Sequence, residues 1–262
     1  SAWRSNALHD SLPTTCRRYS HMRYLVISDV HANLEALEAT LSAADSYDRV
    51  LVLGDLVGYG ADPNAVIDRV RALPTAAIIR GNHDKVSTGI DGIEGFNLVA
   101  RSAVEWTAAA LTTENRTWLT ALPQGPVLVD EVTQICHGTP QDEDQYVFDQ
   151  IDALRAIQSA QRPLCLYGHT HVPAVYILQE PHTQDGDSRS HQGGTMEGIA
   201  PVQGSPFVIA LDSHTRYLVN CGAVGQPRDG DPRAAYGMLD TAARSLTIIR
   251  TTYDVATAMA KI

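Results

Sequence analysis

Short apolar runs alternate with longer amphipathic segments over the first third of the chain. Residues 23–28, 49–53 and 76–79 are apolar runs of strand length, and apolar residues recur at helical spacing over 33–44 and 64–72. This order of strands and helices predicts a parallel sheet with crossover helices. Polar residues follow each predicted strand. Because the carboxyl ends of parallel strands share one edge of a sheet, we expect a functional site at that edge.

The rest of the chain is richer in strands. Helical spacing continues over residues 96–111, from 113 onward and over 149–160. Strands are predicted over residues 126–130, 132–136, 164–167, 175–178, 207–211, 217–220, 235–239 and 246–252. A first half of strand–helix units followed by a second half of strands predicts an α/β fold, with two packed sheets and helices outside them.

Two polar segments stand apart from this pattern. Residues 1–21 have no periodicity, and the sequence Ser20-His21-Met22 is typical of a tag or a non-native leader. A transit-type peptide is the alternative, because the segment carries Ser, Thr and Arg. Residues 180–205 are rich in Gln, Gly, His, Asp and Ser, which predicts a flexible surface insertion. We therefore expect a single domain over residues 22–262.

Composition and charge narrow the classes of partner. The chain has 262 residues, 44% of them hydrophobic and 19% charged, which is ordinary for a soluble globular protein. Its net charge of −10 argues against stable nucleic-acid binding, although bound divalent metals would still allow an anionic substrate. No apolar run is long enough to predict a membrane partner. The four cysteines form no C-x-x-C pair, so we expect a reducing, cytoplasmic setting; the sequence predicts no oligomeric state.

Five polar motifs, each directly after an apolar run, carry the candidate chemistry. They are Ser28-Asp29-Val30-His31, Gly54-Asp55-Leu56-Val57-Gly58, Arg80-Gly81-Asn82-His83-Asp84, Cys136-His137-Gly138 and Gly168-His169-Thr170-His171. In an extended segment, residues two apart point the same way, so Asp29 can converge with His31, and His169 with His171. Imidazole and carboxylate ligands together suit Zn, Fe, Mn or Ni. Together with the amide of Asn82, the motifs offer seven candidate ligands. Seven ligands are too many for one ion and suit two ions that share a carboxylate.

The five motifs, in this order, resemble those of the calcineurin-like metallophosphoesterase superfamily. The stretch Asn220-Cys221-Gly222-Ala223-Val224-Gly225-Gln226-Pro227-Arg228 is similar to the small bacterial phosphodiesterase branch. The resemblance implies a four-layer αββα sandwich of two mixed sheets flanked by helices. It also implies two divalent transition-metal ions, with Mn as the ion expected to support activity in vitro. The first ion would be held by Asp29, His31, Asp55 and His171, and Asp55 would bridge to a second ion held by Asn82, His137 and His169.

The resemblance further implies phosphodiester hydrolysis with a metal-bridging hydroxide as nucleophile. His83, oriented by Asp84, would act as general acid, and Arg80 would bind a phosphate oxygen. The motif that contains Asp55 lacks the arginine that protein phosphatases carry there, which favours phosphodiesters or small nucleotides as the small phosphoester substrate.

Other readings stay open from the sequence alone. A phosphomonoesterase acting on proteins or nucleotides is one alternative, and a non-catalytic scaffold of the same fold is another. Tyr59 either lines the pocket or packs as an ordinary tyrosine. Arg228 and Arg233 lie in a loop rich in Gly, Pro and Asp, where they either meet substrate or pair with Asp229 and Asp231.

Overall fold

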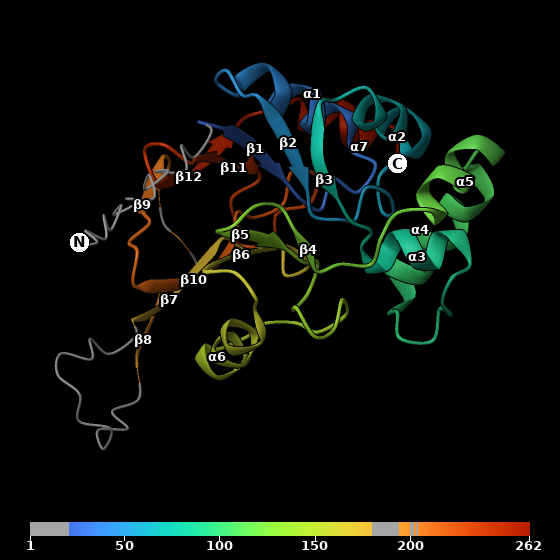
Figure 1. Ribbon diagram of the computed structural model, residues 1–262. Helices are drawn as coiled ribbons and strands as arrows, with labels where there is room; N and C mark the ends of the chain where they lie inside the picture. Colours follow the sequence, from blue (N-terminus) through green and yellow to red (C-terminus); the bar gives the residue numbers. More distant parts are fainter. Residues whose placement is uncertain (1–20, 180–193, 200–201, 203) are drawn as a thin grey trace, which may run out of the picture.

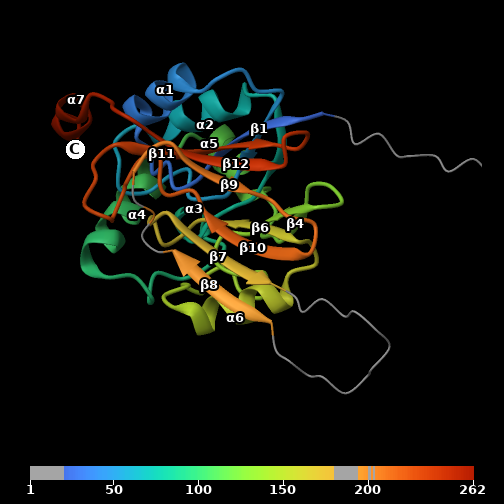
Figure 2. The same ribbon diagram turned by 90° about the vertical axis from the view of Figure 1, so that its left-hand side faces the viewer.

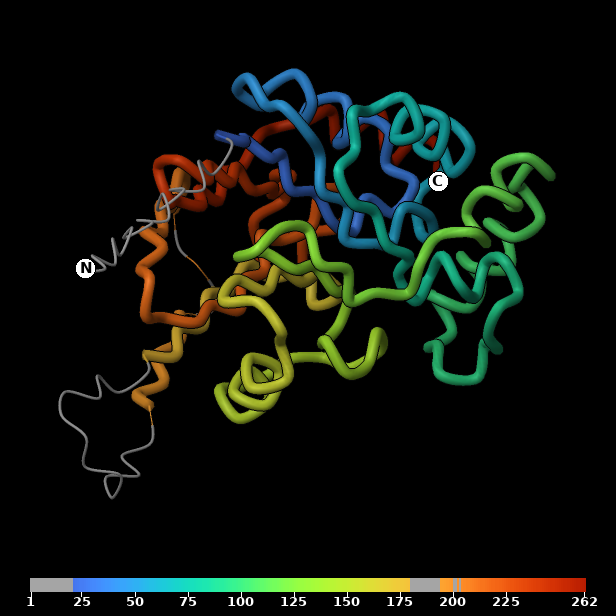
Figure 3. Tube along the Cα trace, in the orientation of Figure 1, coloured from blue at the N-terminus to red at the C-terminus, as the bar shows by residue number. Residues whose placement is uncertain are grey.

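The computed structural model describes residues 21–179, 194–199, 202 and 204–262. Two six-stranded sheets face each other, and helices cover their outer faces (Figure 1). In the Cα trace, the blue to teal segments of β1–β3 and the red segments of β11 and β12 share one sheet, whereas green and yellow segments form much of the other (Figure 3). The predicted α/β fold and the αββα sandwich are therefore confirmed.

The first sheet has the strand order β3-β2-β1-β11-β12-β9. Its strands are β1 (Arg23–Ile27), β2 (Arg49–Val52), β3 (Thr75–Ile78), β9 (Phe207–Ala210), β11 (Ala234–Asp240) and β12 (Ser245–Thr251). β1, β2 and β3 are parallel, joined by the crossover helices α1 (Leu34–Ala43) and α2 (Pro63–Arg71). The predicted βαβαβ opening is thus present, with each boundary within one or two residues of its predicted position.

The second sheet has the strand order β4-β5-β6-β10-β7-β8. Its strands are β4 (Val127–Leu128), β5 (Thr133–Ile135), β6 (Leu164–Tyr167), β7 (Ala174–Gln179), β8 (Thr195–Ile199) and β10 (Thr215–Asn220). β5, β6 and β10 run parallel, and α6 (Gln150–Ser159) covers the outer face of this sheet (Figure 2).

Alternation along the strands builds three apolar layers. In β1, Val26 joins the core between the two sheets, whereas Leu25 and Ile27 join the core under α1 and α2. In β6, Leu166 faces the first sheet and Tyr167 packs toward α6. Because side chains of a strand alternate between its faces, a continuous apolar run is what a strand buried on both faces requires.

Two helices were not predicted. α3 (Asn82–Thr88) contacts α4 (Leu98–Ala110) and α5 (Thr113–Thr120) at one end of the sandwich, and α7 (Val255–Ala260) packs against α1. α3 is short and begins inside a polar motif, and no residue of α7 is buried. Neither helix therefore carries the apolar stripe on which a prediction from periodicity depends.

Part of the predicted insertion at 180–205 belongs to the second sheet. Thr195–Ile199 forms β8, which pairs antiparallel with β7 as an edge strand (Figure 2). Its sequence is polar and contains a glycine, so it does not look like a strand. The strand forms because its backbone pairs with β7. Residues 180–193, 200–201 and 203 of that prediction, and residues 1–20 of the leader predicted over 1–21, lie outside the described residues. In the part of the chain that is described, no helix is long and apolar enough to cross a membrane.

Candidate metal centre

The loops that follow the parallel strands of both sheets meet at one place between the sheets. The loops after β1 and β2 run side by side, since the backbone N–H of Asp29 donates to Gly54 O (3.1 Å) and that of His31 to Asp55 O (2.9 Å). The backbone N–H of His169, after β6, donates to Asp29 Oδ1 at 3.1 Å. This last bond joins the two sheets. The site therefore lies at the carboxyl edge where the sequence predicted it.

The backbone at this edge is held in the left-handed region. Among the described residues, eight non-glycine positions have positive φ, and five of them are predicted metal ligands: Asp29, His31, Asp55, His169 and His171. Their φ values lie between 48° and 66°. Such a conformation costs a non-glycine residue about 1–2 kcal/mol, and strain of this kind concentrates at functional sites. The surrounding structure thus holds these five side chains in directions that a relaxed loop would not give them.

Two glycines permit close approaches at the site. A Cβ on Gly81 would lie 2.1 Å from Asp55 Oδ1, and a Cβ on Gly58 would lie 2.4 Å from His83 Nδ1. Both distances are far below van der Waals contact, so a side chain at either position would displace a predicted site residue. Gly58 also has a φ of +89°, which favours glycine on conformational grounds.

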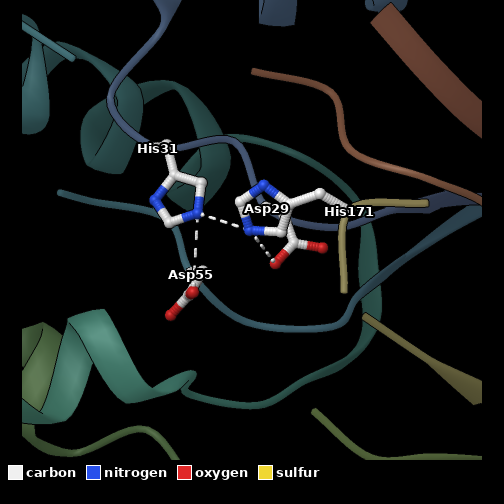
Figure 4. Close-up of side chains that lie close together, drawn as sticks. All are labelled: Asp29, His31, Asp55 and His171. Carbon is white, nitrogen blue, oxygen red and sulfur yellow. Dashed lines mark hydrogen bonds and ion pairs between the residues drawn. The ribbon is translucent and has the colours of Figure 1, made fainter. Parts of the chain in front are cut away.

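The predicted ligands fall into two groups that share one carboxylate. Ligand atoms of Asp29, His31, Asp55 and His171 lie within 4.8 Å of one another, and so do those of Asp55, His137 and His169. In the first group, His31 Nε2 lies 3.1 Å from His171 Nε2 and 3.5 Å from Asp55 Oδ2, and His171 Nε2 lies 3.4 Å from Asp29 Oδ1 (Figure 4).

The second group includes the predicted amide ligand. His137 Nε2 lies 3.4 Å from Asp55 Oδ2 and 3.2 Å from Asn82 Oδ1. The structure therefore brings all seven predicted ligands together, although they come from both sheets and span residues 29 to 171.

Backbone carbonyls set the orientation of the four imidazoles. In each ring, one nitrogen faces a carbonyl oxygen: His31 Nδ1 faces Val57 O (3.0 Å), His137 Nδ1 faces Leu53 O (2.7 Å), His169 Nε2 faces Asp144 O (3.0 Å) and His171 Nδ1 faces Gln226 O (2.7 Å). A carbonyl oxygen only accepts, so these nitrogens carry the hydrogen. The other nitrogen of each ring is left for a ligand, which is how metal-binding histidines are commonly oriented.

These residues fit a bound cation. With their Nδ1 atoms donating, His31 and His171 in their neutral form direct two nitrogen lone pairs at each other across 3.1 Å. Asp29 Oδ2 and Asp55 Oδ2 are buried and have no hydrogen-bond partner among the described residues. Buried acceptors left unpaired cost about 1–3 kcal/mol each, and more when charged. A divalent cation relieves this arrangement, and a set of imidazole, carboxylate and amide donors suits transition metals.

The pKa values of these residues in the absence of metal also favour a bound cation. Burial lowers the pKa of His31 and of His169 to about 3, so both rings are neutral, as metal ligands must be. Burial raises the pKa of Asp29 to about 7. His137 is the exception: burial lowers its pKa, but the Asp55 carboxylate outweighs this and raises it to about 10. The Asp55 carboxylate thus favours positive charge beside it.

His83 lies beside the first ligand group, but the carboxylate of Asp84, its predicted partner, is bound elsewhere. Its ring is buried, with centroids 4.8 Å from His31 and 4.6 Å from Tyr59, and its Nδ1 has no partner among the described residues. The Asp84 carboxylate instead accepts the backbone N–H groups of Gly81 (3.0 Å) and Val57 (3.1 Å). The prediction that Asp84 orients His83 needs this correction. Neighbouring residues of a helix do not face each other, and Asp84 holds the turn that presents Asn82 and His83.

Arg80 lies close to the site and is held by a carboxylate. Its Nε lies 3.1 Å and its Nη2 3.0 Å from the two oxygens of Glu143, which also accepts from Lys85 Nζ at 3.3 Å. Lys85 in turn pairs with Asp144 at 2.5 Å. Glu143 follows Arg80 by 63 residues, on the loop after β5, so no local pattern in the sequence could reveal this ion pair.

Aromatic side chains and one arginine form the rim. Tyr59, which the sequence left open, lies 4.9 Å from the His31 ring; Tyr146, which was not predicted, lies 3.8 Å from the His169 ring. Of the two arginines left open, Arg233 pairs with Asp231 at 2.6 Å, whereas the Arg228 guanidinium lies 5.8 Å from the Tyr59 ring. No spacing rule connects these loop residues to the motifs, which is why they escape prediction.

Comparison with known proteins gives one matching family model, one similar protein and two similar solved structures. A family model described as the calcineurin-like phosphoesterase superfamily domain matches residues 22–244. An uncharacterized protein of Methanocaldococcus jannaschii is 32% identical over 247 residues, which are 90% of each chain. A crystal structure of a metallophosphoesterase from Sphaerobacter thermophilus superimposes with a TM-score of 0.75 and 37% identity, covering 92% of each chain. A hypothetical protein from Pyrococcus horikoshii, with a TM-score of 0.66, 17% identity and 92% coverage of each chain, supports the fold alone.

Proposed function

This chain belongs to the calcineurin-like phosphoesterase superfamily, and we propose on that basis that it is a metal-dependent hydrolase of phosphodiester bonds. The observation that carries the proposal is the pair of ligand groups that share Asp55. We infer that Asp29, His31, Asp55 and His171 hold one divalent ion, and that Asp55, Asn82, His137 and His169 hold a second. Such ions would polarise the phosphoryl oxygens and lower the pKa of a bound water, and Mn is the ion we expect to support activity in vitro.

The chain's own residues supply the remaining functions. We assign His83 to donate a proton to the leaving oxygen, because its buried Nδ1 is unpaired and its ring lies beside His31. Asp84 positions this acid indirectly, through the backbone of the turn that carries it. The candidate role of Arg80 in binding phosphate stays a prediction, and it requires the guanidinium to leave Glu143.

The charge around the site favours a diester. The Asp55 motif has no arginine, and the positive charge of Arg80 is balanced by Glu143. A phosphodiester carries one negative charge, whereas a monoester carries up to two at neutral pH and gains more from additional cations. A non-catalytic scaffold is disfavoured, because all seven candidate ligands and His83 are present.

Paired chromogenic substrates test this proposal. Hydrolysis of bis-p-nitrophenyl phosphate should exceed that of p-nitrophenyl phosphate in kcat/KM, should require added Mn²⁺ and should stop with EDTA. A preference for the monoester would overturn the diester assignment in favour of a phosphomonoesterase. Turnover of neither substrate by protein with its metal bound would support the scaffold.

A further inference from the structure

Two arginines of one loop have opposite surroundings. Arg233 forms an ion pair with Asp231, with Nε–Oδ1 at 3.0 Å and Nη2–Oδ2 at 2.6 Å. Arg228, five residues earlier, is held by neutral oxygens: its Nη2 donates to Gln226 Oε1 at 2.8 Å and to the Tyr59 hydroxyl at 3.4 Å. In the described ranges of the chain, no carboxylate forms an ion pair with Arg228. Its positive charge is therefore available to a ligand, whereas that of Arg233 is balanced.

Arg228 is tied to the metal centre through its backbone and its neighbours. Its backbone N–H donates to the carbonyl of His171 at 3.3 Å, and the carbonyl of Gln226 faces His171 Nδ1 at 2.7 Å. The Tyr59 ring, beneath the guanidinium, contacts the rings of His31 and His83 at 4.9 Å and 4.6 Å. The guanidinium thus lies over a ring that contacts both a candidate metal ligand and the candidate acid.

Open space lies next to this guanidinium. A pocket of about 720 Å³ is lined by Tyr59, Asn97, Leu98, Val99, Gln226 and Arg228. Leu98 and Val99, at the start of α4, are 80% and 72% exposed, so apolar surface faces solvent beside the charged group. A phosphoester combines an anionic group with an organic group, and this pocket offers a matching surface for each.

We propose that Arg228 binds a non-bridging oxygen of the substrate phosphate, while the ester's organic group lies against Leu98 and Val99. Gln226 and Tyr59 hold the guanidinium without neutralising it, so a phosphate displaces no carboxylate. Arg80 would first have to break its bond to Glu143. This inference rests on the proposed function, and it names a residue that contacts the substrate phosphate beside a surface that suits an apolar or aromatic ester group.

The test compares three arginines in the full-length, manganese-loaded protein. Arg228→Gln and Arg228→Lys are made alongside Arg80→Gln, with Arg233→Gln as the matched control from the same loop. Calorimetry with inorganic phosphate gives a dissociation constant that does not depend on turnover, and bis-p-nitrophenyl phosphate gives KM and kcat separately. Metal content and the unfolding temperature are measured for every variant. Arg228 is exposed, so its replacement should leave the fold intact.

Arg228→Gln should weaken phosphate binding and raise KM by about tenfold or more, the loss expected for one charge-assisted hydrogen bond. Arg228→Lys should recover part of the loss, because a lysine keeps the charge without the planar fork. Arg233→Gln should match the wild type. Phosphate binding by Arg228→Gln equal to that of the wild type would overturn the inference, and so would a loss seen in Arg80→Gln instead. If the wild type binds phosphate but hydrolyses no diester, the proposed function fails while the calorimetry still decides the role of Arg228.

Discussion

Two polar clusters meet at the turn between β3 and α3, and they differ in how their charges are balanced. On one side, Asn82 and His83 face the metal centre, where buried carboxylate oxygens lack partners and two imidazole nitrogens oppose each other. On the other side, Arg80 and Lys85 face Glu143, and the charges there are paired within the protein.

The difference distinguishes a site for a ligand from a site that stabilises the fold. A buried polar group that finds its partner in the chain needs nothing else, whereas a group of buried acceptors without donors implies a cation from outside. By this criterion we expect the centre around Asp55 to bind a ligand and the cluster around Glu143 to stabilise the fold. Substitutions in each should therefore have opposite consequences for metal content and for stability.

Asp55→Asn should have the largest effect. Asp55 belongs to both ligand groups, and an amide in its place offers one neutral oxygen where a carboxylate offers two charged ones. We expect bound metal to fall by at least one equivalent per chain, measured by mass spectrometry of the metals, and kcat/KM to fall about a thousandfold or more. Asp62→Asn is the control, because Asp62 belongs to neither ligand group and pairs with Lys261 instead. A fully active and fully metallated Asp55→Asn variant would contradict the assignment of this centre.

His83→Ala should lower activity without loss of metal. The ring lies beside the ligands but belongs to neither group, so removing it leaves the donors in place. Loss of a general acid typically lowers kcat about a hundredfold or more. The deficit should be smaller for a diester with a p-nitrophenol leaving group than for one with an alkyl alcohol, because a good leaving group needs little protonation. An equal deficit for both would remove the acid role from His83.

The sequence predicted one of these two clusters and missed the other. Asp29, Asp55, His137 and His169 each lie within two residues of the end of an apolar run, so the pattern that predicts a strand also locates its candidate ligand. The bond between Arg80 and Glu143 joins separate loops, and the bonds of Asp84 depend on how a short helix turns. Strands such as β1 and β6 are also predictable, because burial on both faces requires a continuous apolar run. β8 is not, because it forms by pairing with β7, and its own sequence does not show that pairing.

Glu143→Gln should produce the reverse of Asp55→Asn. It would leave the side chains of Arg80 and Lys85, 16% and 7% exposed, without their shared carboxylate. Breaking a largely buried ion pair lowers the free energy of unfolding by about 3 kcal/mol, and the remaining exposure of Arg80 favours the lower end of such effects. We expect a lower midpoint in urea unfolding with unchanged metal content. A gain in phosphate affinity in this variant would revive the predicted role of Arg80; a loss of metal would contradict the separation of the two clusters.

We also expect the stability of the metal-free protein to depend on pH. Burial lowers the pKa of His31 and His169 in the fold to about 3, whereas both titrate near 6.5 in the unfolded chain. Between these pH values the two histidines bind protons in the unfolded chain but not in the folded protein. The free energy of unfolding therefore decreases as the pH falls from about 6.5 toward 3. Asp29 acts in the opposite sense, because burial raises its folded pKa to about 7 and its protonation favours the fold as the pH falls below that value.

The imidazoles outnumber the raised carboxylates, so the net slope should follow the histidines. Burial also lowers the pKa of His83 to about 4 and that of His171 well below its usual value, which sets four such rings against the carboxyls of Asp29 and Asp84, both with a pKa raised to about 7 by burial. One uncompensated proton corresponds to about 1.4 kcal/mol per pH unit. Urea unfolding of EDTA-treated protein at pH 6.5, 5.5 and 4.5 should show this decline, and His31→Gln should flatten it. A free energy of unfolding that increases on acidification would mean that the carboxylates, and not the imidazoles, determine the pH dependence of the EDTA-treated protein.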